Sequence, residues 1–142
     1  MPFIENVSRD DIIHGWHTNA GPNSMVIQIS DITKPHPEPN NEFRYSLQCQ
    51  FEDIDIDDPE LGSINDFHAH QIAHALRYAY SKGANVVVHC HHGLCRSGAV
   101  VEAGMWIGFK STGRNRLPNV LVARKVIECF KQYPASLPII GV

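Results

Sequence analysis

Between residues 88 and 98 the chain reads Val88-His89-Cys90-His91-His92-Gly93-Leu94-Cys95-Arg96-Ser97-Gly98. The segment Asn85–His89 is β-branched and apolar, which predicts a strand buried on both faces. A helix is expected from about Arg96 to Ile107. Between a strand and a helix start, backbone N–H groups converge on one centre, and the helix N-terminus adds positive potential. The stretch therefore predicts a loop that binds an anion.

Four residues of this loop fit the chemistry of a phosphate group. Cys90 stands at the floor of the predicted loop, where the same field favours the thiolate over the thiol. Arg96 can fold back over the loop and hold two phosphate oxygens with its planar guanidinium. Gly93 permits the backbone conformation that turns several N–H groups toward one point. The Ser97 hydroxyl can hydrogen-bond the thiolate, so the loop predicts a nucleophile at a phosphate site.

These residues resemble the His-Cys-x-x-Gly-x-x-Arg-Ser signature of the protein tyrosine and dual-specificity phosphatases. The resemblance covers about residues 43–130. It implies that Cys90 attacks phosphorus and forms a phosphocysteine, while Arg96 and the loop amides stabilise the transition state. Ser97 belongs to the implied catalytic set, and neither a metal nor another cofactor is required. The implied phosphate-binding residues are His91, His92, Gly93, Leu94, Cys95 and Arg96.

The resemblance also implies a general acid, an aspartate upstream that protonates the leaving oxygen and then activates water. Asp53 is favoured because it stands at the end of a predicted strand, which fixes position better than a count of residues across a loop. Asp55 is the next choice. The acidic run 52–60 also fits an ordinary solvated loop. The candidates for the acid are Asp53, Asp55, Asp57 and Asp58.

Two other groups of cysteines and histidines have alternative interpretations. One alternative is a zinc site in the loop, although its candidate ligands are too close together in sequence to form a tetrahedron. These ligands are His89, Cys90, His91, His92 and Cys95. Cys95 either fills space beneath the loop or traps oxidised Cys90 as a disulfide, and the sequence favours neither. His70 and His74 are spaced four apart on a predicted helix and are expected on its solvated face, with metal binding as the less favoured alternative.

The rest of the chain alternates between predicted strands and helices. Ser63 is expected to cap a helix that runs to about Ser81, and Pro118-Asn119 to open the last helix. The alternation predicts an α/β fold with a central, mostly parallel sheet flanked by helices. The resemblance makes this fold dual-specificity-phosphatase-like, with residues 1–142 as a single phosphatase domain. The remaining expected elements are a short helix or turn at Asp10–Gly15, strands at Met25–Ile29 and Phe43–Phe51, a loop at Thr33–Asn41 and a helix at Val120–Tyr133.

Composition narrows the range of partners. The formal net charge of −3 argues against a general nucleic-acid binder, which would usually carry a basic surface. The longest apolar runs are too short to span a bilayer, and the N-terminus lacks the regions of a signal peptide. We therefore expect a cytoplasmic protein whose partner is a phosphorylated protein or peptide, with no nucleic acid and no membrane. The sequence predicts no oligomeric state.

The expected substrate is phosphotyrosine in proteins, with phosphoserine and phosphothreonine as an extension. One alternative keeps the chemistry and changes the substrate to a phosphoinositide, a nucleotide or an RNA 5′-phosphate. The loop carries histidines and no lysine, which disfavours a polyphosphorylated substrate. A second alternative is a phosphopeptide-binding module without catalysis, which would require the loss of the cysteine, the arginine or the acid.

Overall fold

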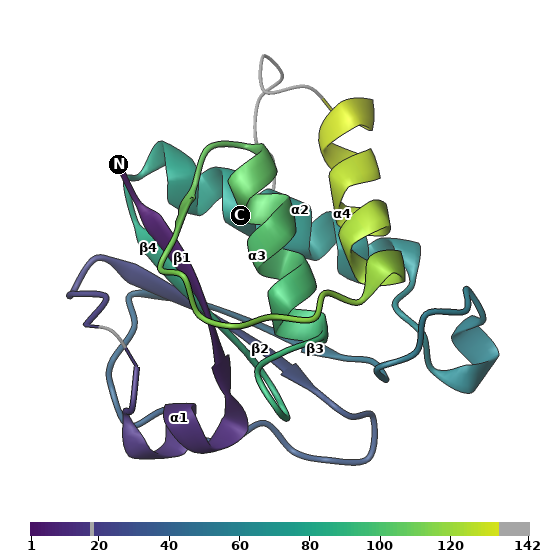
Figure 1. Cartoon of the computed structure of the whole chain (residues 1–142), viewed down its shortest axis with the longest axis horizontal. Helices are drawn as coiled ribbons and strands as arrows, with labels where there is room; N and C mark the ends of the chain where they lie inside the picture. The colour runs from purple at the N-terminus through teal and green to yellow at the C-terminus, as the bar shows by residue number, and fades with distance from the viewer. Residues whose placement is uncertain (18, 134–142) are drawn as a thin grey trace.

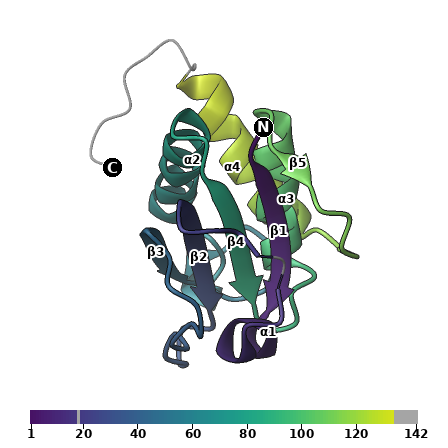
Figure 2. The ribbon, with the colours of Figure 1, turned by 90° about the vertical axis from the view of Figure 1, so that its left-hand side faces the viewer.

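A parallel sheet of five strands forms the centre of the part of the chain that the structure describes, in the order β3-β2-β4-β1-β5. The structure is a computed structural model that describes residues 1–17 and 19–133. Because the paired strands are parallel, the carboxyl ends of β1 to β4 meet at one edge of the sheet (Figure 2). The strands are β1 (Phe3–Ser8), β2 (Ser24–Ser30), β3 (Tyr45–Gln50), β4 (Asn85–Cys90) and β5 (Lys110–Ser111).

Helices cover both faces of this sheet. The helices α2 (Asp66–Ser81), α3 (Arg96–Trp106) and α4 (Val120–Gln132) lie together on one face, and the short α1 (Arg9–His14) lies at the opposite face (Figures 1 and 2). A single 3-10 turn, η1 (Pro59–Leu61), interrupts the segment between β3 and α2. The predicted α/β fold, with a parallel sheet flanked by helices, is confirmed.

The central strand β4 is buried on both faces, as its sequence predicts. Successive side chains of a strand point to opposite faces. Val86 and Val88 accordingly belong to the large core beneath α2, α3 and α4, whereas Val87 packs with Ile12 of α1 in a second, smaller core. The strand is thereby held in place from both sides, and its last residue, Cys90, has a fixed position.

Some element boundaries differ from those expected. No strand is predicted at β1, because Glu5 and Asn6 interrupt its apolar pattern, and yet both side chains are buried in the structure. Ser63 does not cap α2. The cap is Asn65, whose side chain accepts a hydrogen bond from the His68 N–H at 2.7 Å. The Ser63 hydroxyl instead accepts from the backbone N–H of Asp58 at 3.0 Å, within the preceding turn.

The other expected elements are present. Asp10–Gly15 was expected as a short helix or turn and corresponds to α1, which Ser8 caps. Asn119 caps α4, accepting hydrogen bonds from the N–H groups of Leu121 and Val122 at 3.0 and 3.2 Å. Among the described residues, no helix is both long and apolar enough to cross a membrane.

Candidate active site

Cys90 is the last residue of β4, and its side chain is only 3% exposed. Its Sγ lies 3.2 Å from the Ser97 hydroxyl oxygen, and the Ser97 backbone N–H donates to the same sulfur at 3.5 Å. Ser97 belongs to the first turn of α3, so the sulfur faces the positive end of that helix. The structure therefore brings the predicted nucleophile and the predicted serine together at the start of α3.

The loop between β4 and α3 turns its carbonyl groups outward. Four of them accept hydrogen bonds from outside the loop: those of His91, Gly93, Leu94 and Cys95 bind, respectively, the Arg9 N–H at 3.2 Å, the Asn6 side chain at 2.8 Å, the Leu117 N–H at 3.1 Å and the Asn119 N–H at 2.9 Å. A trans peptide points its N–H away from its C=O. The N–H groups that face the interior of the loop are therefore those of His92, Leu94, Cys95 and Arg96.

Gly93 is the one loop residue whose identity the backbone dictates. Its φ is +75°, a conformation that side chains rarely adopt. A Cβ atom at this position would lie 2.5 Å from the backbone N of Ser8 and 2.5 Å from the carbonyl carbon of Val7. Gly93 thus allows the loop to pack directly on the end of β1, where Asn6 binds its carbonyl group.

Arg96 is nearly fully buried, at 4% exposure, and it is held at one end of its guanidinium. Nη1 donates to the Phe51 carbonyl at 2.7 Å and forms an ion pair with Asp31 Oδ1 at 2.8 Å. Nε is buried and has no hydrogen-bond partner among the described residues. In arginine, the edge formed by Nε and Nη2 can bind an oxyanion in a bidentate manner, and in Arg96 the Nε donor of this edge is unused.

Among the predicted acids, Asp53 lies beside the loop. Its Oδ1 accepts a hydrogen bond from the Asn119 side-chain amide at 2.9 Å, and the same amide donates to the Ile54 carbonyl at 3.1 Å. Asn119 also binds the Cys95 carbonyl through its backbone N–H at 2.9 Å. One residue therefore connects the segment of Asp53 to the anion-binding loop.

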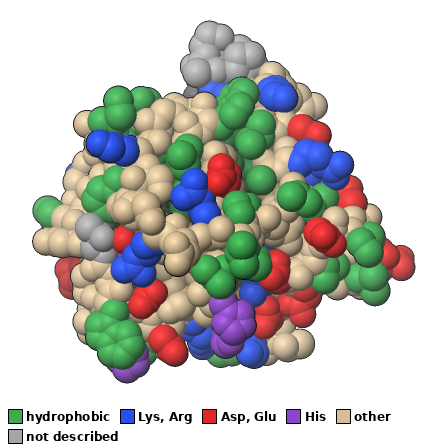
Figure 3. Space-filling view, in the orientation of Figure 1, with side chains coloured by type: hydrophobic (Ala, Val, Ile, Leu, Met, Phe, Trp, Pro, Cys, Tyr) green, Lys and Arg blue, Asp and Glu red, His purple; other side chains and the backbone are tan. Residues whose placement is uncertain are grey.

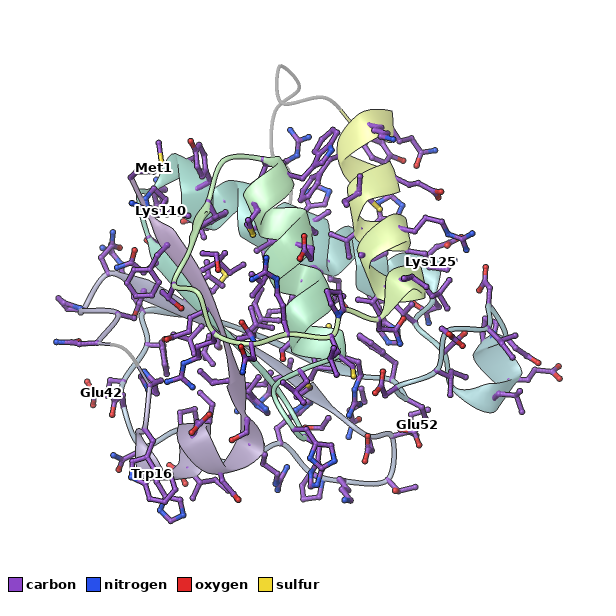
Figure 4. The ribbon with its side chains drawn as sticks, in the orientation of Figure 1. Met1, Trp16, Glu42, Glu52, Lys110 and Lys125 are labelled. Carbon is purple, nitrogen blue, oxygen red and sulfur yellow. The ribbon has the colours of Figure 1, made fainter. Side chains whose placement is uncertain are left out.

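The other three aspartates point to other partners or to solvent. Asp57 forms an ion pair with Lys125 of α4 at 3.3 Å, on the side of the molecule where Figure 4 labels Lys125. Asp58 caps η1, accepting from the backbone N–H of Glu60 at 3.1 Å. Asp55 is exposed. The structure thus brings Asp53 to the loop and gives Asp57 and Asp58 structural partners.

Solved structures resemble the fold of this chain, whereas no protein-family model and no curated protein matches it. A mouse protein assigned as a dual specificity phosphatase, complexed with zinc tungstate, aligns with a TM-score of 0.52 at 18% identity, covering 94% of this chain and 73% of that one. This chain has the fold of a dual specificity phosphatase. The active form of Tk-PTP aligns with a TM-score of 0.42 at 12% identity, covering 96% of this chain and 84% of its own.

In this dual specificity phosphatase fold, the histidines around Cys90 differ in environment. His89 is 1% exposed, and burial lowers its pKa to about 4, so its ring is neutral at pH 7. His91 and His92 are exposed, with ring centroids 4.5 Å apart. A neutral, buried imidazole therefore precedes Cys90 in β4, and two exposed imidazoles follow it in the loop.

Cys95 lies in the same loop and contacts the candidate acid. Burial raises the pKa of its thiol, and the nearby Asp53 carboxylate raises it further through charge and a hydrogen bond. At neutral pH the side chain is therefore a protonated thiol, which is a poor metal ligand and a weak nucleophile. Within residues 1–17 and 19–133, no group of three or more His, Cys, Asp or Glu side chains is arranged to hold a metal ion.

His70 and His74 do not lie on a fully solvated face, contrary to the expectation from their spacing. Both are half-buried and line a hollow between β3 and α2, together with Tyr45 and Tyr78. The ring of His70 also packs edge-on against Tyr133, with centroids 5.2 Å apart. The expectation failed because helical spacing shows only which residues share a face of α2. It does not show that Tyr45 and Tyr133, which come from other segments, lie beside this face.

Three residues that support the site are not predicted from the sequence. Asn6 and Arg9 come from β1 and the start of α1 and hold the loop carbonyls, and Asp31 follows β2 and binds Arg96. They lie far from the loop in sequence and reach it only because β1 and β2 are neighbours of β4 in the sheet. The sequence offered one signal for Asp31, because it is a polar residue just after a predicted parallel strand, where binding sites of such sheets lie.

Proposed function

We propose that this chain is a member of the protein tyrosine phosphatase superfamily that hydrolyses phosphotyrosine in proteins, with residues 1–142 forming one phosphatase domain. One observation carries the proposal. The Cys90 sulfur lies at the floor of a loop whose N–H groups face inward, next to Arg96, whose buried Nε has no partner among the described residues. Such a site offers donors to the equatorial oxygens of a phosphoryl group and a nucleophile beneath it.

In the first step, the Cys90 thiolate attacks phosphorus in line and the bond to the substrate oxygen breaks. Asp53, in its protonated form, gives its proton to that oxygen, so a neutral alcohol or phenol leaves. The inward N–H groups and Arg96 stabilise the charge on the three equatorial oxygens. The Ser97 hydroxyl, 3.2 Å from the sulfur, stabilises the thiolate before attack and again when it departs.

In the second step, water hydrolyses the phosphocysteine. The Asp53 carboxylate accepts a proton from the water, whose oxygen attacks phosphorus while the sulfur leaves as thiolate. The products are inorganic phosphate and free enzyme. The chemistry needs a residue that alternates between acid and base, and Asp53 is the aspartate that hydrogen bonds to Asn119 tie to the loop.

The burial of the site favours phosphotyrosine over shorter phosphoresidues. Cys90 and Arg96 are 3% and 4% exposed, so the phosphate must enter below the protein surface. A phosphotyrosine ring reaches further than a phosphoserine or phosphothreonine side chain, which we propose as slower substrates. Cys49, Cys90, Cys95 and Cys129 are free thiols, as is usual for a protein that works in a reducing compartment such as the cytoplasm.

Hydrolysis of p-nitrophenyl phosphate by the wild type and by Cys90→Ser tests the proposal. We expect turnover by the wild type, none by Cys90→Ser, and a phosphorylated cysteine at position 90 after rapid quenching. A panel of phosphotyrosine, phosphoserine and phosphothreonine peptides, a phosphoinositide, a nucleotide and an RNA 5′-phosphate then ranks the substrates. Binding of phosphopeptide without turnover by the wild type would instead identify a binding module.

A further inference from the structure

The strand β3 forms one edge of the sheet among the described residues (Figure 2). The N–H of Phe51, just past the strand, donates to the Ser30 carbonyl at 3.1 Å, so Phe51 points toward β2. Backbone groups of alternate residues point to opposite sides of a strand, and those of Ser46, Gln48 and Gln50 therefore point away from β2. The exposed side chains of β3 belong to the same three residues and are uncharged. The edge thus lacks the charges and prolines by which edge strands usually exclude a further strand.

The hollow between β3 and α2 lies beside this edge and has a volume of about 470 Å³. Its walls are largely apolar or aromatic: Tyr45 and Leu47 come from β3, and Phe67 and Tyr78 come from α2. Phe67 is 67% exposed, although it is a large apolar residue. Successive side chains of a strand alternate between faces, so a strand added to β3 would direct every second side chain toward the hollow. Edge and hollow therefore fit one ligand, an extended segment with alternating apolar residues.

Two cations lie at the end of the hollow where Tyr45 and Tyr78 meet. The two rings pack edge to face, with centroids 5.3 Å apart. The Arg44 guanidinium lies 5.4 Å from the centroid of the Tyr45 ring, and the Lys82 ammonium lies 5.5 Å from that of Tyr78. Both cations are exposed, and neither forms an ion pair with a described carboxylate, that of the neighbouring Glu42 included. This end of the hollow therefore presents positive charge that the fold does not compensate.

The other end of β3 has the opposite charge. The strand runs from Tyr45 toward the acidic segment 52–60, and Figure 3 shows acidic side chains gathered on the right-hand side of the molecule, where this segment lies. Carboxylates of a bound segment are attracted to Arg44 and Lys82 beside Tyr45 and are repelled at the opposite end. A second copy of the chain would bring the same edge and the same two cations, so the charges disfavour it as the ligand.

We propose that the β3 edge and the hollow form a docking surface for an extended segment of a partner protein, with alternating apolar residues and with carboxylates at the end beside Tyr45. The segment pairs with β3 as a further strand, and its apolar side chains enter the hollow between Leu47 and Phe67. This inference goes beyond the proposed function, because neither Cys90 nor Arg96 takes part in it.

Peptides with one charged end test the docking surface. Peptides of about eight residues, long enough to pair along β3, alternate Leu with Thr and carry Glu at their first or at their last two positions. The two orders cover parallel and antiparallel pairing, and counterparts carry Gln or Lys in place of Glu. Fluorescence anisotropy gives the Kd of each peptide. We expect one Glu order to bind about fivefold more tightly than its Gln counterpart, and the Lys counterpart to bind weakest, as for partly screened ion pairs.

Amide hydrogen exchange followed by NMR locates the bound peptide. At saturating Glu peptide, the N–H groups of Ser46, Gln48 and Gln50 should exchange at least about tenfold more slowly, because the outer N–H groups of β3 then donate to the peptide. The N–H groups of β5, at the opposite edge of the sheet, should exchange at the rates of the free protein.

Matched variants at exposed positions assign the affinity to this surface. Arg44→Gln and Lys82→Gln should each lower the ratio of the Glu-peptide to the Gln-peptide affinity, and the double variant should bring this ratio close to one. Phe67→Ser removes an apolar wall and should weaken the Glu and Gln peptides alike, by about fivefold. Lys110→Gln is the control, because it removes an exposed lysine at the opposite edge of the sheet, and it should keep the wild-type affinities.

Equal affinities of the Glu, Gln and Lys peptides, or no binding at about 1 mM peptide, would overturn the proposal. Binding that leaves the exchange of Ser46, Gln48 and Gln50 unchanged would also overturn it, because the peptide then lies elsewhere. In the free protein, slow exchange of these amides at every protein concentration would mean that another part of this chain covers the edge. Slow exchange that appears only as the protein concentration rises would mean that a second copy covers it. Either result would replace the partner segment, and none of these measurements depends on turnover.

Discussion

The Arg96 guanidinium is anchored through Nη1 to the Asp31 carboxylate, at 2.8 Å, and Phe51 accepts from the same nitrogen through its carbonyl at 2.7 Å. Asp31 directly follows β2 and Phe51 directly follows β3. The ends of two neighbouring strands therefore hold one end of the arginine. The opposite edge, with the buried Nε, stays available. The arginine is therefore oriented before any phosphate binds, which lowers the entropic cost of forming the clamp.

This anchoring predicts different effects for two substitutions of Asp31. Asp31→Asn retains an oxygen that accepts from Nη1, so kcat/KM for p-nitrophenyl phosphate should fall less than about threefold. Asp31→Ala removes the acceptor and leaves the arginine free to tilt, so kcat/KM should fall by about tenfold or more. Steady-state kinetics at matched ionic strength measure both. Equal activity of Asp31→Ala and the wild type would mean that Phe51 alone orients the clamp.

Asp53→Asn tests the general acid. The substitution preserves an acceptor for the Asn119 amide and removes the proton, so kcat for phenyl phosphate should fall by about 100-fold. The loss should be smaller with p-nitrophenyl phosphate, whose leaving group departs without protonation. Asp57→Asn is the matched control, because it lies in the same acidic segment and pairs with Lys125. A larger loss in Asp57→Asn or Asp55→Asn would move the role to that residue.

The strand, loop and helix around Cys90 were predictable because their determinants are local. A β-branched run, one glycine and an arginine at a fixed spacing lie within the segment 85–98, and the structure places each of them as expected. The position of Asp53 followed from a strand end, since β3 ends only three residues before it. A local sequence pattern is enough to predict a site when the residues that form it are close together in the chain.

The supporting residues were not predictable, because sheet order positions them. Asp31 reaches Arg96 since β2 lies beside β4, and Asn6 reaches Gly93 since β1 lies on the other side of β4. A single sequence does not specify which strands are neighbours. The strand β1 was not predicted because it contains buried polar residues. Their partners come from distant segments: Asn6 binds the carbonyls of Gly93 and Asn115, and Glu5 pairs with Arg114 at 2.9 Å.

Gly93→Ala should destabilise the protein strongly. The added methyl group meets the backbone of Val7 and Ser8 at 2.5 Å, and φ stays at +75°, so we expect the free energy of unfolding to fall by more than about 3 kcal/mol. Gly113→Ala is the control. It has φ of +87° with no atom within 4 Å, so only the backbone cost of about 1 kcal/mol applies. Urea unfolding measures both, and similar losses would contradict the steric argument.

Cys95 provides a prediction about oxidation. Hydrogen peroxide converts the Cys90 thiolate to a sulfenic acid, which can condense with the Cys95 thiol to a disulfide and water. Because burial and Asp53 raise the pKa of Cys95, we expect a small disulfide fraction at pH 7 and a larger one at pH 9. Asp53→Asn should increase the fraction at pH 7, since it removes one cause of the raised pKa. Mass spectrometry distinguishes the products.

Cys90 sulfonic acid with no 90–95 disulfide at either pH would indicate that Cys95 only fills space. Cys95→Ser serves as the control for the identity of the partner, because it retains a small polar side chain of similar size. Any disulfide within one molecule that persists in this variant must involve Cys49 or Cys129, both of which are buried thiols distant from the loop in sequence.

His89 should make the stability of the fold depend on pH. Burial lowers its pKa from 6.5 to about 4, so between these values the unfolded chain binds more protons than the folded one. The contribution of the neutral ring is fully present above pH 6.5 and is lost as the pH falls toward 4. From pH 7 to pH 5 the free energy of unfolding should fall by about 2 kcal/mol from this residue. His36 and His68, whose pKa values are also lowered by burial, act in the same direction.

Urea unfolding at pH 7, 6 and 5 measures this slope for the wild type and for His89→Gln. The glutamine does not titrate, so the slope should become shallower by the share that His89 contributes, whatever the absolute stability of the variant. His14→Gln is the matched control, because it makes the same substitution at an exposed histidine, at the end of α1. An unchanged slope in His89→Gln would show that His89 binds protons equally in the folded and the unfolded chain, and therefore that burial does not lower its pKa.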